Sequence, residues 1–195
     1  MLISIRKFLR HLPILNTRGG VMVEFAFAMP LLITLLLGGV ELGRYVLLHQ
    51  KLDRTAMTVS DLVARVTSVT PSDLDTVLNA ADLVMSPFDF GDKGVVIISS
   101  VKQKTPSGQP KVIWQRKGAG TLNQSSELGH TDTDAVLPNN ALVSTTQAIV
   151  VGETYYTYTP WFITMIPSTT IRHVAYFRPR LSNEVTCSTC PPTTN

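Results

Sequence analysis

Oxygen and imidazole side chains alternate in the run His130-Thr131-Asp132-Thr133-Asp134. Donors of this kind bind a hard cation when several of them converge on one point. A calcium-binding EF-hand loop is longer and carries a glycine and a final glutamate, neither of which stands in the required place here. We therefore expect a solvated polar loop and assign no metal, with cation binding of this loop as the alternative.

Two cysteines, Cys187 and Cys190, lie near the C-terminal end. In a reducing compartment this spacing indicates metal or redox chemistry, but a zinc site needs two further ligands and a thioredoxin-like site needs a βαβ context. In an oxidising compartment the pair is expected to form a local disulfide that holds a tail rather than a core. An intermolecular bridge is the alternative.

The sequence contains no GxSxG, HExxH or phosphate-binding motif. We therefore predict that the protein is not an enzyme and uses no cofactor. The densest aromatic group consists of Tyr155, Tyr156, Tyr158, Trp161 and Phe162. We expect a strand that packs these rings into the core, with an exposed contact surface as the alternative.

Charge is distributed unevenly along the 195 residues. The first 18 residues contain four basic and no acidic side chains, whereas the rest of the chain contains 13 lysines and arginines and 14 acids. The net charge of +3 therefore comes from one end of the chain. The nearly neutral remainder offers no basic face for phosphates, so no nucleic-acid partner is expected.

An apolar segment, VMVEFAFAMPLLITLLLGGV, follows the basic end and occupies residues 21–40. A helix of about 20 apolar residues spans the hydrocarbon core of a bilayer. A buried core helix would usually have a polar face, which this segment lacks apart from Glu24 and Thr34. Because basic flanks favour the cytoplasmic side, we predict a single span with its N-terminus inside and residues beyond about 45 exported.

A cleaved secretory signal is the competing interpretation of this segment. Ala26-Phe27-Ala28 has the form of a cleavage site, but the apolar run continues to Val40, and cleavage would leave an apolar mature end. Glu24 also fits poorly, since a charge within a membrane helix costs about 2.5–3.5 kcal/mol on insertion scales. Glu24 is expected either to reach the cytoplasmic surface or to have a partner.

The residues around Glu24 resemble the processing site of type IV pilin-like proteins. Several blocks within residues 18–44 resemble the TadE-like family, pseudopilins of the tight-adherence (Flp) pilus machinery: Arg18-Gly19-Gly20, Val23-Glu24-Phe25-Ala26, Pro30-Leu31-Leu32 and Gly38-Gly39-Val40-Glu41-Leu42-Gly43-Arg44. Two later runs, residues 155–160 and 177–180, give weaker support.

The resemblance implies that a prepilin peptidase cuts between Gly19 and Gly20, which makes Glu24 the fifth residue of the mature chain. Because the glycine is doubled, a cut after Gly20 is the alternative. The resemblance also implies that Glu24, with Phe25 beside it, acts in assembly by pairing with the N-terminal amine of a neighbouring subunit. Such pairing would offset the desolvation of both charges.

Three residues of the apolar segment bear on helix packing. Pro30 removes one backbone donor, which membrane helices tolerate with a kink or local loosening. Gly39 and Gly43 have the GxxxG spacing that lets two membrane helices approach closely. A tolerated proline and a chance glycine spacing are the alternatives.

The periodicity of the remaining chain predicts an α+β fold. An amphipathic helix continues the span to about Val66, with a break at Gly43 as the alternative. A second helix begins at Thr70-Pro71 and ends at Ser86-Pro87. Strand patterns cover residues 95–101, 112–115, 148–158 and 170–177, with a polar loop over 117–140. We expect helices on one face of a small antiparallel sheet, a pilin-like arrangement.

The expected organisation is a basic cytoplasmic leader (1–19), a transmembrane helix (20–43), an exported α+β domain (44–181) and a C-terminal tail (182–195). The resemblance implies a minor pseudopilin in the inner membrane. Its implied partners are the prepilin peptidase, other pseudopilins, the Flp pilin and the inner-membrane secretion platform. The alternative function is a signal-anchored envelope protein whose exported domain binds a ligand or cation.

Overall fold

The structure is a computed structural model that describes residues 17–137, 143–162 and 167–190. Two helices, α2 (Thr17–Ala64) and α3 (Pro71–Met85), precede four strands. The strands are β1 (Gly94–Gln103), β2 (Pro110–Gly118), β3 (Ile149–Tyr158) and β4 (Thr169–Phe177). The predicted α+β class is confirmed, and residues 1–16 of the predicted leader lie outside the described residues.

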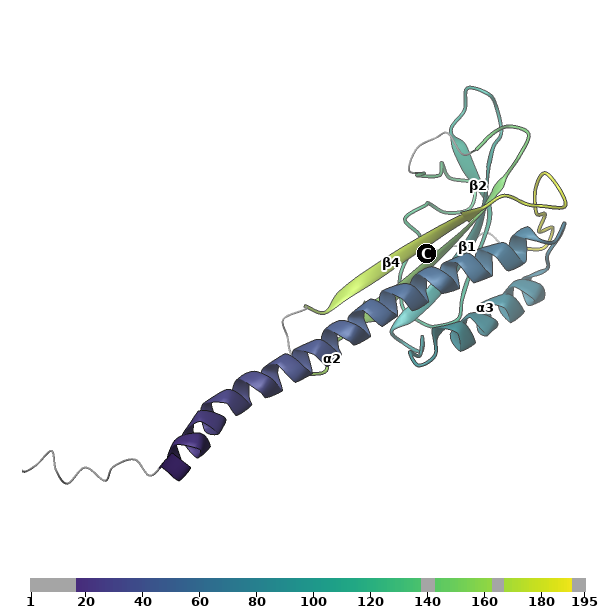
Figure 1. Cartoon of the computed structure of the whole chain (residues 1–195). Coiled ribbons are helices and arrows are strands. Elements are labelled where there is room, and N and C mark those ends of the chain that lie inside the picture. Colours follow the sequence, from purple (N-terminus) through teal and green to yellow (C-terminus); the bar gives the residue numbers. More distant parts are fainter. Residues whose placement is uncertain (1–16, 138–142, 163–166, 191–195) are drawn as a thin grey trace, which may run out of the picture.

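Helix α2 runs without interruption through 48 residues, which gives a length of about 72 Å at 1.5 Å per residue. The alternative of two helices separated at Gly43 is therefore wrong. The N-terminal part of α2 projects from the rest of the molecule, and the C-terminal part lies along the sheet (Figure 1). Leu48, Leu52, Val59 and Val63 face the core at helical spacing, so one helix both projects from the domain and builds its core.

Helix α3 begins where the sequence predicts. Thr70 accepts a hydrogen bond from the backbone N–H of Asp73, and the Asp73 side chain accepts one from the Thr70 N–H. This capping box satisfies two donors that the first turn of a helix leaves unpaired. Pro71 occupies the first helical turn, where its missing N–H is not needed. Lys51 of α2 donates to the Val84 carbonyl at 3.1 Å and ties the two helices together.

The four strands form one antiparallel sheet in the order β2-β1-β3-β4. Helix α2 packs across β3 and β4, and α3 packs against α2 and β2. Both helices lie on one face of the sheet (Figure 1), as predicted. The strand ends differ from the predicted ones by at most three residues, and the ends at Tyr158 and Phe177 agree.

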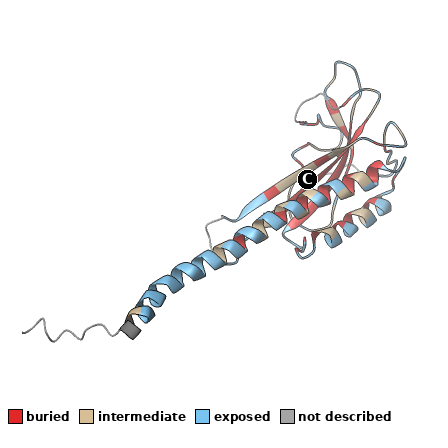
Figure 2. Ribbon diagram, in the orientation of Figure 1, coloured by how far each residue is buried: buried red, intermediate tan, exposed pale blue. Residues whose placement is uncertain are grey.

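The sheet is buried on both faces, which explains why β1 and β3 are almost continuously buried (Figure 2). The main core lies between the helices and the sheet. On the other face the long β2–β3 connection supplies Leu128, Ala135, Leu137 and Val143, which pack on strand residues Val101, Val112, Ile149 and Val151. The polar loop predicted over 117–140 therefore contributes buried apolar side chains.

A buried carboxylate holds this connection in place. Glu153 on β3 is fully buried and accepts hydrogen bonds from Ser126, from the Tyr155 hydroxyl at 2.8 Å and from Arg172 at 2.7 Å. A buried charge is tolerated when it is paired and hydrogen-bonded in this way. Burial is the main cause that raises the pKa of Tyr155, and the charge of Glu153 adds to it.

Helix α2 approaches β3 closely because residue 152 is glycine. A Cβ at Gly152 would meet the Ser60 hydroxyl and would lie 3.0 Å from the Ala56 carbonyl oxygen. Nearby, His49 of α2 and His173 of β4 are joined by a hydrogen bond of 2.9 Å between Nδ1 and Nε2. Asp53 lies 3.7 Å from the other nitrogen of His173. Burial, and then the neighbouring His173, lower the pKa of His49.

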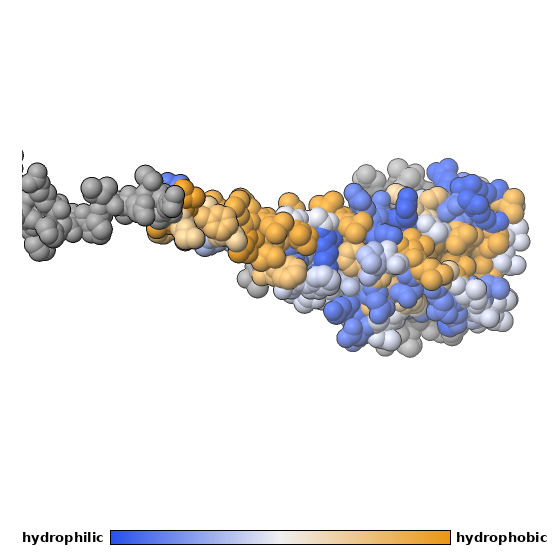
Figure 3. All heavy atoms as spheres, turned by 60° about the horizontal axis from the view of Figure 1, so that its bottom comes forward, coloured by the Kyte–Doolittle hydropathy of each residue, from blue (hydrophilic) through white to orange (hydrophobic). Residues whose placement is uncertain are grey.

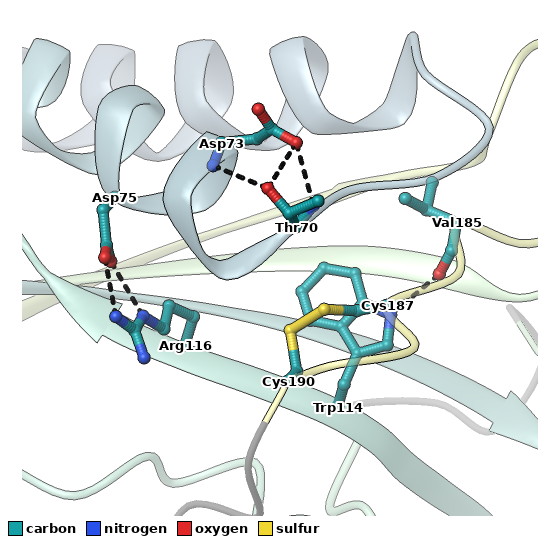
Figure 4. Close-up of a disulfide and its surroundings, with 8 residues drawn as sticks. All are labelled: Thr70, Asp73, Asp75, Trp114, Arg116, Val185, Cys187 and Cys190. Carbon is teal, nitrogen blue, oxygen red and sulfur yellow. Dashed lines mark hydrogen bonds and ion pairs between the residues drawn. A yellow bond between two sulfur atoms is a disulfide. The ribbon is translucent and has the colours of Figure 1, made fainter.

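Residues 182–190 of the C-terminal segment pack against the domain. The Trp114 indole donates to the Val185 carbonyl at 2.7 Å, and Val185 is part of the main core. Cys187 and Cys190 form a disulfide that packs against the same core (Figure 4). The disulfide is local, as expected, and through its two half-buried cysteines the stretch of tail that it closes packs against the core.

Candidate functional site

The projecting part of α2 is apolar and exposed. Of the described residues, this one helix is long and apolar enough to cross a membrane. Its large side chains are open to solvent, with Met22 77% and Phe27 80% exposed. In Figure 3 hydrophobic (orange) residues cover most of this part of α2, and hydrophilic (blue) residues are mixed with them where the helix meets the domain. An exposed apolar helix with no protein around it is explained by a bilayer as its surroundings.

The residues of the predicted processing site lie at the N-terminal end of α2. Gly19 and Gly20 fall within its first turn, and Glu24 and Phe25 follow on the exposed part of the helix. Phe25 is 57% exposed. The structure assigns Glu24 no ion pair or hydrogen bond with any side chain that it describes, so its carboxylate is available to another group.

Pro30 lies within α2, and the Thr34 hydroxyl donates to the Pro30 carbonyl at 2.8 Å. The helix curves in its N-terminal part and is straight along the domain (Figure 1), as expected for a proline that removes one ladder hydrogen bond. Open space surrounds Gly39 and Gly43, since a Cβ at either would meet nothing within 4 Å. A second helix could approach there, but no described residue occupies that space.

A second glutamate, Glu41, differs from Glu24 in its burial and in its hydrogen bonds. It lies one residue beyond the apolar run and is only 3% exposed. One carboxylate oxygen accepts from the Tyr158 hydroxyl, and the other accepts from the backbone N–H groups of Trp161 and Phe162 at 3.0 and 3.1 Å. This carboxylate therefore fastens α2 to the end of β3 and to the residues that follow it.

Arg44 completes the junction one turn along α2. Its guanidinium lies 3.7 Å from the centre of the Trp161 ring and 3.8 Å from Glu41. It also donates to the Thr159 carbonyl at 3.4 Å. A cation over an indole face is attracted by the ring quadrupole. We call Glu41, Arg44, Tyr158, Trp161 and Phe162 the neck cluster, because they lie where the projecting helix enters the domain.

The aromatic group of the sequence is divided by the structure. Tyr155, Tyr156 and Tyr158 are buried, as predicted, whereas Trp161 and Phe162 are 67% and 55% exposed. Burial, and then the hydrogen bond to Glu41, raise the pKa of Tyr158 to about 12. The two exposed rings correct the expectation that the whole group packs into the core.

The neck cluster was not predicted from the sequence. Its signal was an acid and a base three residues apart at the end of an apolar run, Glu41 and Arg44, in a chain that also has a tyrosine-rich strand. Both residues belong to the block 38–44 that resembles the TadE-like family, but that resemblance assigns them no contact. Their partners lie more than 110 residues away, so no local pattern could pair them.

The other candidate residues lie elsewhere and are not brought together with the anchor. Asp132 and Asp134 each lie near a lysine, at 3.6 Å from Lys104 and 3.8 Å from Lys111, instead of converging on one point. Within the described ranges no group of three or more His, Cys, Asp or Glu side chains could hold a metal ion. The Cys187–Cys190 disulfide follows Thr186, whose backbone is hydrogen-bonded to Thr67 and Val69 just beyond the C-terminal end of α2.

These features define a class of protein in which one N-terminal apolar helix, a candidate membrane span, continues directly into the core of a small α+β domain. Comparison with known families agrees with the resemblance inferred from the sequence. The model of the family described as TadE-like protein matches residues 19–60. No curated protein and no solved structure matches the chain.

The family match covers most of α2 and both glutamates, and it includes both glycines of the predicted cut. It associates this helix with assembly of the tight-adherence pilus. The α3 helix and the four strands lie outside the matched residues. The match therefore covers the helix together with Glu41 and Arg44, the two neck-cluster residues that the helix carries.

Proposed function

We propose that the protein is a minor pseudopilin, a structural or assembly component of a tight-adherence pilus or a related secretion machine. A prepilin peptidase removes the basic leader on the cytoplasmic side of the inner membrane. The mature helix stays in the membrane by its apolar N-terminal part, with the α+β domain on the extracytoplasmic side. Its partners are the peptidase, other pseudopilins, the Flp pilin and the secretion platform.

The observation that carries this proposal is the TadE-like match over residues 19–60, which begins at the predicted cut and extends through the helix. The exposed, unburied state of the projecting helix supports it, because a helix that is to pack among other subunits must not already be covered by its own domain. The basic leader supports the orientation, since positive flanks stay in the cytoplasm.

Glu24 has a defined role in this proposal. Cleavage after Gly19 creates a positively charged amine at Gly20 near neutral pH. Residues four apart are neighbours on a helix, so the amine lies one turn from the Glu24 of its own chain and can also meet the Glu24 of an adjacent chain. Either charge alone in hydrocarbon would be expensive, and pairing across subunits offsets this penalty. Assembly is then favoured in the register that brings the two charges together.

Processing is tested by co-expressing the full chain with a prepilin peptidase and determining the mature N-terminus by mass spectrometry. A chain beginning at Gly20 or Val21 supports the proposal, and a chain that retains Met1 contradicts it. Gly19→Leu and Gly20→Leu form a matched pair. A cut after Gly19 is blocked by the first substitution and tolerates the second, and a cut after Gly20 shows the reverse.

Assembly is tested with Glu24→Gln and Glu24→Asp in cells that carry the rest of the pilus machinery. The neutral variant should be processed and inserted but should fail to co-purify with other pilus subunits. The aspartate variant retains the charge and should recover part of the association. Normal association of the glutamine variant would show that the carboxylate is not needed.

The alternative function, a signal-anchored protein with a ligand- or cation-binding domain, has less support. The carboxylates of the loop at 130–134 are paired with lysines, so cation binding there would have to break two ion pairs. That the protein is not an enzyme stays a prediction.

A further inference from the structure

Two exposed aromatic rings stand beside the helix in the neck cluster. Trp161 and Phe162 are 67% and 55% exposed, and their ring centres lie 6.2 Å apart in an edge-to-face arrangement. Their backbone N–H groups are held by the buried Glu41 carboxylate. The rings are therefore displayed from a fixed backbone, which distinguishes them from apolar side chains at the tip of an unrestrained loop.

The contacts of Trp161 and Phe162 fix the position of these rings along the axis of α2. Glu41, which binds both backbone N–H groups, follows directly after the apolar run 21–40. That run is about 30 Å long as a helix, which equals the thickness of the hydrocarbon core. The start of β4 is also the part of the sheet nearest to the projecting length of α2 (Figure 1). A bilayer that covers residues 21–40 would thus have its surface at Glu41 and at the two rings.

The chemistry of the neck cluster suits the zone between hydrocarbon and water. Tryptophan is enriched there because its ring is apolar while its N–H stays hydrated. Arg44, stacked on Trp161, would place a positive charge near the phosphates of such a bilayer. Val40 and Leu42, which flank Glu41 on the helix, are 50% and 57% exposed and present apolar surface at the same height.

We propose that Trp161 and Phe162 insert into the headgroup region of the phospholipid bilayer and form a second membrane contact beside the anchor helix. The domain is then seated on the membrane at two points, and Glu41 makes the connection between them rigid. A single helix would leave the domain free to rotate about the helix axis, whereas two contacts fix which side of the domain faces the lipid. This inference rests on the proposed membrane anchoring of α2.

The chain provides its own fluorescent reporters, since Trp114 and Trp161 are its two tryptophans. Trp114 is 3% exposed and hydrogen-bonded inside the domain. The full chain is reconstituted into vesicles of phosphatidylcholine and phosphatidylglycerol in which phosphatidylcholine carries bromine at acyl carbons 6 and 7 or at carbons 11 and 12. The Trp161→Phe variant reports Trp114 alone, and subtracting its emission from that of the wild type gives the emission of Trp161.

Trp161 emission should move to shorter wavelength on reconstitution and should lose more intensity with the shallow bromines than with the deep ones. Trp114 emission should not respond to bromine and serves as the check that each variant is folded. The matched control is Leu32→Trp in the Trp161→Phe background, which places a tryptophan near the middle of the apolar run. Its emission should be quenched most by the deep bromines.

Three results would overturn the proposal, and they separate it from the proposed function. Quenching at residue 32 without quenching at Trp161 means that the anchor is inserted but the rings do not touch lipid. Quenching at neither position means that the helix is not in the bilayer, which removes both proposals. A Trp161 signal that changes with the protein-to-lipid ratio and ignores bromine means that the rings face another protein molecule.

Discussion

Replacing Glu41 with alanine should release the projecting helix from the end of the sheet. The carboxylate accepts three hydrogen bonds, from the Tyr158 hydroxyl and from the N–H groups of Trp161 and Phe162. Truncation leaves three donors without an acceptor. Breaking a buried charged interaction in this way costs about 3–5 kcal/mol, and we expect about 3 kcal/mol because the site lies at the edge of the domain.

This loss can be measured in two ways on the full chain in detergent micelles. For a domain of about 150 residues, 3 kcal/mol corresponds to a fall in Tm of about 6–12 °C. If only the neck opens, hydrogen exchange of the amides at 161 and 162 should accelerate by about 100-fold, since 1.4 kcal/mol is a factor of ten. Glu41→Gln keeps one oxygen for the two backbone donors, so its loss should be about 1 kcal/mol.

Glu24→Ala is the matched control because it removes the other glutamate of the same helix. Glu24 is exposed on the projecting part of α2, so its removal should leave both the Tm and the exchange rates unchanged. The two glutamates should thus separate cleanly, with Glu41 needed for the fold of the neck and Glu24 for association. The reasoning is refuted if Glu41→Ala unfolds at the wild-type temperature and its amides at 161 and 162 exchange at the wild-type rate.

Three further perturbations follow from the packing of the domain. The pKa of His49 is lowered from 6.5 by burial and by His173. The domain should therefore keep its full free energy of unfolding above pH 6.5 and lose part of it as the pH drops through the folded-state pKa of His49. His49→Gln should flatten this fall in thermal scans between pH 7.5 and 5.5. Gly152→Ala should push α2 away from the sheet and lower the free energy of unfolding, measured by denaturant titration, by about 1–3 kcal/mol. Gly39→Ala is the control, because open space surrounds Gly39, and it should leave that free energy unchanged. Replacing both Cys187 and Cys190 with serine should cost about 2 kcal/mol, since the closed loop is short. A larger loss, measured with and without reductant, would mean that the disulfide does more than close that loop.

The elements of this fold were predictable because their signals are local. Thr70 and Asp73 form a capping box at the start of α3, with Pro71 in the first turn, as residues of these types indicate, and the strand predicted over residues 148–158 is β3. The continuity of α2 through Gly43 was predicted as one of two alternatives, since a single glycine weakens a helix by only about 1 kcal/mol. Burial of Leu48 and Leu52 in the core stabilises the helix in the turns that follow Gly43.

The site was predictable only in part, and the reason is physical. The roles proposed for Gly19, Gly20 and Glu24 rest on a local pattern, so a sequence resemblance can point to these residues. Glu41 acquires its role from partners 117 to 121 positions away. A charge beside an apolar run is ordinarily a solvated flank, and only the return of the chain along β3 turns it into a buried acceptor. Trp161 likewise reaches its exposed position beside α2 only because β3 leads the chain back to Glu41.

The order in which the chain is made gives the C-terminal segment a further importance. Residues near position 180 and beyond close onto the end of α2: the Arg180 N–H donates to the Ala64 carbonyl at 2.9 Å, and the Val69 N–H donates to the Thr186 carbonyl at 2.9 Å. Val185 fills the core beside Trp114. The core beside the end of α2, which is synthesised early, is therefore complete only after residues 180–186 have been synthesised. A nascent chain that stops before residue 180 would contain the complete apolar helix and a domain whose core is still open beside Trp114.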